Sequence, residues 1–100
     1  MKEIPNDKLK PYDIPDPDGD LNEWFDFAHT INGYEEAGSF KACAELANEQ
    51  SAKTLTEMRC ALLFEARRDR HSGGMGYIDT DWIRKLLRGI KEMVEAQGNL

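Results

Sequence analysis

The densest group of chemically capable side chains is the run of residues 67–71, Arg-Arg-Asp-Arg-His. Within it, Arg67, Arg68 and His71 continue the helix face that carries Phe64. Arginine holds carboxylates and phosphates through paired hydrogen bonds, and histidine changes its charge near neutral pH. The run therefore predicts a site for an anion or a small molecule, with catalysis there as an open alternative. Its candidate residues are Arg67, Arg68, Arg70 and His71.

The same run also has a structural interpretation. Cations near a helix C-terminus interact favourably with its partial negative charge, by about 0.3–1 kcal/mol each. A partly buried arginine on the Phe64 face would then pair with an acid such as Asp26, Glu35 or Glu36. The sequence leaves both interpretations open, because ion-pair networks and functional sites use the same residue types.

Residue types that bind metals are too scattered to predict a metal centre. Cys43 and Cys60 lie far apart in apolar helical stripes, whereas zinc sites usually contain closely spaced pairs. We expect both cysteines to be buried in the core as reduced thiols. The alternating acids of residues 16–20 fail the calcium-loop pattern, because Ile14 and Phe25 stand where that pattern needs acids. No metal and no cofactor are expected.

The net charge of −6 opposes binding to nucleic acid. The charge is uneven, because residues 1–57 contain 13 acids and 5 bases whereas residues 58–100 contain 6 acids and 8 bases. The two halves are therefore expected to pair, either within one fold or across a dimer. Nucleic-acid binding by the more basic half is kept as a further alternative, although net charge disfavours that partner.

All four prolines lie within residues 1–19, which predicts an extended N-terminal arm. Apolar side chains punctuate this arm at Ile4, Leu9, Tyr12 and Ile14. An arm of this kind is expected to lie along a folded body, either its own or that of a partner.

Residues 20–98 are predicted to form one all-α domain, a small bundle of three to four short helices. Helices are expected to start at the capping residues Asp20, Ser39 and Thr54, and near Asp79. The helix that follows Thr54 is apolar on most sides, which predicts a central position.

The apolar stripes of these helices define the expected core. Gly89 interrupts the last stripe, which indicates that a neighbour approaches closely there. The predicted core residues are Trp24, Phe25, Ala28, Phe40, Cys43, Leu46, Leu55, Met58, Leu62, Leu63, Trp82, Ile83, Leu86, Leu87 and Ile90.

No stretch is long and apolar enough to span a membrane, and no apolar segment follows Lys2, so we expect a cytoplasmic location. Because no catalytic motif is present, we expect a small non-enzymatic protein that acts through protein–protein interaction or regulation. The alternative that it is an enzyme stays open. The expected partner is a second copy or another protein, contacted through the arm and the apolar face of the last helix.

Overall fold

The computed structural model describes residues 4–29, 40–71 and 79–98, without the side chains at positions 22 and 69–71. These ranges are helical and contain no strand, which confirms the all-α fold class. The helices are α1 (Trp24–His29), α3 (Phe40–Glu49), α4 (Leu55–His71) and α5 (Thr80–Ala96). None of the helices in these ranges is long and apolar enough to cross a membrane.

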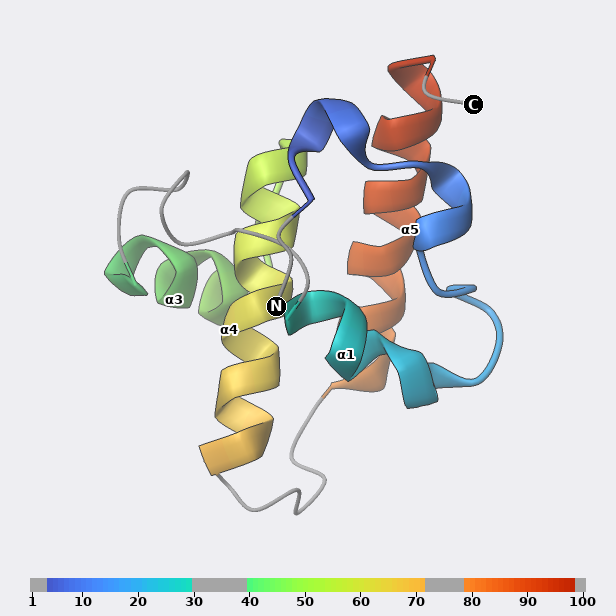
Figure 1. The fold of residues 1–100 in the computed structure, drawn as a ribbon. Helices are drawn as coiled ribbons and strands as arrows, with labels where there is room; N and C mark the ends of the chain where they lie inside the picture. Colours follow the sequence, from blue (N-terminus) through green and yellow to red (C-terminus); the bar gives the residue numbers. More distant parts are fainter. Residues whose placement is uncertain (1–3, 30–39, 72–78, 99–100) are drawn as a thin grey trace.

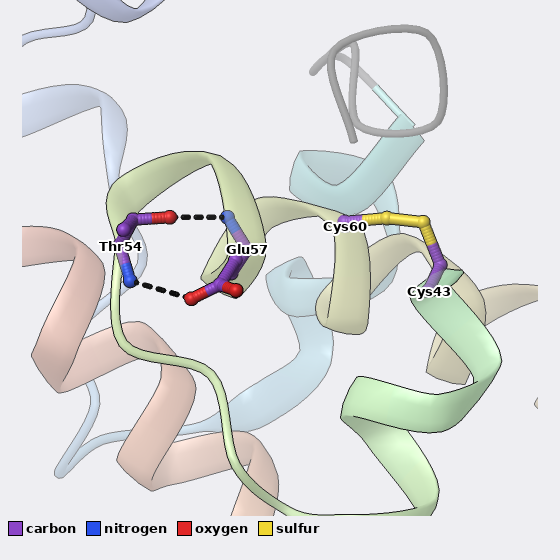
Figure 2. Close-up of a disulfide and its surroundings, with 4 residues drawn as sticks. All are labelled: Cys43, Thr54, Glu57 and Cys60. Carbon is purple, nitrogen blue, oxygen red and sulfur yellow. Dashed lines mark hydrogen bonds between the residues drawn. A yellow bond between two sulfur atoms is a disulfide. The ribbon is translucent and has the colours of Figure 1, made fainter. Parts of the chain in front are cut away.

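Helix α4 is central, as its apolar circumference predicts, because α1, α3 and α5 all pack against it (Figure 1). A capping box fixes its start. The Glu57 amide donates to Thr54 Oγ1 and the Thr54 amide donates to Glu57 Oε1, both at 3.1 Å (Figure 2). Each bond satisfies an amide that has no partner inside the helix.

Helix α5 begins at the N-cap Asp79, whose carboxylate accepts from the amides of Asp81 and Trp82. Ile83, Leu87 and Ile90 of its apolar face are fully buried inside the chain. The close approach predicted at Gly89 is present, because a Cβ atom there would lie 2.8 Å from Met58 Sδ of α4. Glycine therefore lets the two helices pack closely at this position.

The N-terminal arm packs on its own chain. It contains two 3-10 turns, η1 (Asn6–Lys8) and η2 (Pro11–Asp13), so it is not extended throughout. In Figure 1 it leads from α4 across to α5 and returns to α1. Leu9 is fully buried and Ile14 is 7% exposed, so both belong to the core.

Basic residues of α5 hold the acidic arm. Arg84 Nη1 donates to the carbonyl oxygens of Pro17 and Gly19, both at 2.8 Å, and Arg88 Nη2 lies 2.6 Å from Asp18 Oδ1. The predicted pairing between the acidic and basic halves therefore occurs within one chain.

The cysteine prediction is right about burial and wrong about oxidation state. Cys43 of α3 and Cys60 of α4 are fully buried, but they form a disulfide (Figure 2). Their Cα atoms are 5.3 Å apart, within the range that a disulfide spans. The two sulfur atoms meet because the apolar faces of α3 and α4 pack against each other. A disulfide is not specific to the cytoplasm, so the location stays a prediction.

The predicted burial of Phe40 is also wrong, because this residue is 56% exposed. It occupies the first turn of α3, and its ring packs against Phe64 at 5.2 Å between centroids. An aromatic contact at the surface thus replaces the expected burial. Trp24, Phe25, Leu46 and Met58 are partly buried and pack against the core.

Candidate functional site

Arg68 holds α3 and α4 together. Its Nε lies 3.1 Å from Glu65 Oε1, and its Nη2 donates to Asn48 Oδ1 of α3 at 2.7 Å. The guanidinium carbon lies 4.8 Å from the centroid of the Phe64 ring. We call Arg68, Glu65, Asn48 and Phe64 the Arg68 cluster. A guanidinium engaged on three sides supports the structural interpretation of this arginine.

The rest of the predicted anion site is only partly described. Arg67 is exposed on α4, whereas the side chains of Arg70 and His71 lie outside the described residues. Arg68 pairs with Glu65 of its own helix and not with Asp26, and Glu35 and Glu36 also lie outside the described residues. Binding of an anion by these four residues therefore stays a prediction.

Glu65 is an acid that sequence reasoning missed. It is 4% exposed, and burial raises the pKa of its carboxyl above the ordinary value of 4.5. The Arg68 guanidinium opposes this rise, whereas repulsion from Asp79 adds to it. Desolvation dominates because the carboxylate gives up water on folding and gains a single half-exposed cation.

In the wild type, ionisation of the buried Glu65 carboxyl should lower the free energy of unfolding as the pH rises. Glutamine does not ionise, so we expect Glu65→Gln to lack this decrease. A raised pKa in the folded state means that stability is fully present below pH 4.5 and declines as the pH rises through the folded pKa. The unfolding free energy of Glu65→Gln, minus that of the wild type, should therefore increase from below pH 4.5 towards neutrality. Urea unfolding across this range measures the difference.

Glu57→Gln is the matched control, because the capping bonds lower the pKa of Glu57. The stability that Glu57 contributes is present above pH 4.5 and is lost as the pH falls. The unfolding free energy of Glu57→Gln, minus that of the wild type, should therefore decrease as the pH rises. A flat difference for Glu65→Gln would contradict the assignment of a desolvated carboxyl.

A groove of about 250 Å³ lies between α4, α5 and the segment that joins α3 to α4. We call it the α4–α5 groove. Its volume suits one large side chain and is small for a whole ligand of drug size. Apolar groups form much of its lining, and charged residues of α5 accompany them. The lining residues are Ala52, Met58, Trp82, Lys85, Leu86, Arg88, Gly89 and Glu92.

Trp82 gives the α4–α5 groove its most distinctive chemistry. The residue is 3% exposed, and its buried indole nitrogen has no hydrogen-bond acceptor in the structure. Buried indole N–H groups usually have an acceptor. Lys85, which is exposed, places Nζ 6.0 Å from the centroid of the same ring. The site thus combines an apolar lining with a cation at its rim.

Two larger hollows are lined by acids. One, of about 400 Å³, borders α3 and includes Glu45, Glu49 and Glu57. The other, of about 390 Å³, lies between the arm and α1 and includes Asp13 and Asp26. Within the described ranges no three potential metal ligands gather closely enough to hold an ion.

Comparison with protein-family models, with curated proteins and with solved structures finds no match to this chain. The argument for function therefore rests on the chain's own side chains. The sequence carried one signal for the α4–α5 groove, which is the glycine at position 89 within an otherwise apolar stripe. Six of its lining residues lie on α5, whereas the wall that Ala52 forms depends on the course of residues 50–54, which no periodicity encodes.

Proposed function

We propose that the protein is a non-enzymatic interaction protein that holds one side chain of another polypeptide in the α4–α5 groove. The groove itself carries the proposal, because it is sized for a single side chain and combines an apolar lining with a charged rim. The occupant that suits it is an apolar or aromatic residue beside a carboxylate. The carboxylate would face Lys85, which is exposed at the rim.

Most of the surface that the sequence suggested for binding is buried within the chain itself. The apolar face of α5 is buried, and so are Leu9 and Ile14 of the arm. These residues therefore support the fold of one chain. Tyr12 of the arm is exposed, and the groove, which Trp82 and Leu86 of α5 help to line, is the binding surface that we propose.

Blocked dipeptides test this proposal by NMR. We expect acetyl-Tyr-Asp amide and acetyl-Leu-Asp amide to shift the indole N–H signal of Trp82. Trp24, on α1, serves as an internal reference, because it does not line the groove. Acetyl-Tyr-Lys amide should bind more weakly, since its lysine meets the cation of Lys85.

Two variants that replace an alanine by leucine show where the dipeptide binds. Ala52→Leu fills the α4–α5 groove from its edge and should abolish the shifts, whereas Ala42→Leu adds the same bulk to the acidic hollow and should leave them unchanged. Shifts that centre on Arg67 and Arg68 would instead favour the anion site. No shift with any dipeptide would refute binding in the groove.

A further inference from the structure

We infer that the side chain held in the α4–α5 groove is Tyr12 of a second copy of this chain, an inference that rests on the proposed function. Tyr12 is 82% exposed, the largest exposure among the large hydrophobic residues that the structure describes. A tyrosine on a soluble surface is ordinary, so the argument depends on how this residue is held and on what surrounds it.

The turn that carries Tyr12 is held in place. Within η2 the Lys10 amide donates to Asp13 Oδ2 at 3.0 Å, and the Asp13 amide donates to the Lys10 carbonyl at the same distance. Leu9 and Ile14, on either side of the turn, are buried in the core. The backbone of Tyr12 is therefore already ordered, so docking it costs little conformational entropy.

The arm that carries Tyr12 reaches the edge of the groove. Arg88 lines the α4–α5 groove and pairs with Asp18 of the arm at 2.6 Å, so the arm borders the groove. When one chain carries both a projecting residue and its receptor, two copies related by a twofold axis can exchange them reciprocally. Both contacts then form at once and the assembly closes as a dimer.

The charges beside Tyr12 complement those beside the groove. Lys10 and Asp13 flank the tyrosine, and Glu92 and Lys85 line the groove. Each copy therefore offers one cation and one anion to the opposite charges of the other.

Sedimentation velocity over a concentration series tests the inference on the full chain. We expect the wild type to dimerise, and both Tyr12→Ala and Ala52→Leu to raise the dimer dissociation constant at least about 30-fold, the effect of losing an anchor residue. Because Tyr12 is exposed, its removal should leave the fold intact, which circular dichroism checks. Phe40→Ala removes the other large aromatic residue that is exposed in the described ranges, and it should leave the dimer unchanged.

An equal mixture of the two variants gives the sharpest result. Tyr12→Ala retains a free groove and Ala52→Leu retains its tyrosine, so one contact can form between them. We expect a heterodimer that is weaker than the wild-type dimer, and none from the chain that carries both substitutions. A wild type that stays monomeric, or a dimer that both variants leave intact, would overturn the inference. The dipeptide shifts at Trp82 decide separately whether the groove binds a polypeptide side chain at all.

Discussion

Replacing Arg59 with methionine is expected to lower the free energy of unfolding by about 2–4 kcal/mol. Arg59 lies on α4 and is fully buried, and its guanidinium donates to Asn6 Oδ1 and to the carbonyl oxygen of Ile4. It thereby ties the start of the arm to the central helix. Methionine keeps much of the length and apolar volume of the side chain and removes both donors.

Two opposing terms set this magnitude. Removing the guanidinium relieves the cost of burying a cation, which stabilises the variant. It also leaves two partly buried acceptors without a donor, at no more than about 1–3 kcal/mol each. If that cost exceeds the binding energy of the arm, the arm detaches and its acceptors regain water. The loss of stability is then limited to the burial of Leu9 and Ile14, about 1.5–3 kcal/mol each before ordering entropy is subtracted.

Urea unfolding measures the loss, and limited proteolysis shows where it arises. Cleavage within residues 4–19 should be faster in Arg59→Met than in the wild type, because the detached arm is open to protease. Lys41→Met, at an exposed position on α3, makes a similar chemical change and should alter stability by no more than about 0.5 kcal/mol. Equal stability of Arg59→Met and wild type would show that the arm does not depend on the hydrogen bonds of Arg59.

The sequence predicts the helices well where capping residues and apolar spacing agree. Thr54 with Glu57 marks the start of α4, and the stripe of α5 follows Asp79 as the pattern requires. Both signals are local, so they can be recognised without the rest of the fold. The central position of α4 also follows from its apolar circumference.

Two features of the sequence together explain why Arg59 is buried, namely a helix with neighbours on most sides and a proline-rich arm. A helix surrounded by neighbours buries its polar positions along with its apolar ones, and Arg59 lies within such a helix. A proline-rich arm offers carbonyl oxygens that regular structure does not satisfy. Arg59 donates to one of these, at Ile4, and Arg84 donates to two more, at Pro17 and Gly19. The arm and the arginines are thus complementary, although they lie far apart in the sequence.

The candidate site is less predictable because it depends on long-range geometry. The α4–α5 groove requires the segment of Ala52 to run beside Met58 and Trp82, which no local pattern encodes. For the Arg68 cluster, the sequence identifies the residues but not their partners. Its residue types indicate a site for anions, but the position of Asn48 on α3 gives Arg68 a partner within the chain. Sequence therefore identifies capable residues more readily than it identifies their partners.

Reduction of the Cys43–Cys60 disulfide is expected to lower the free energy of unfolding by about 3 kcal/mol, because the two residues close a loop with a sequence separation of 17. The cross-link limits the conformations open to the unfolded chain. It is not the only connection between α3 and α4, since Arg68 bonds to Asn48 and Phe40 packs on Phe64. We therefore expect the reduced protein to keep its native circular dichroism while its unfolding midpoint falls.

Urea unfolding of the wild type with and without reductant measures this effect, with thiol labelling of the unfolded chain to count free cysteines. The slope of the unfolding free energy against urea should also increase on reduction, because an unfolded chain without the cross-link exposes more surface. The Cys43→Ala, Cys60→Ala double variant should not respond to reductant at all. Two free thiols in the unreduced wild type would contradict the disulfide. An unchanged midpoint after complete reduction would instead mean that the cross-link adds no net stability to the other contacts between α3 and α4.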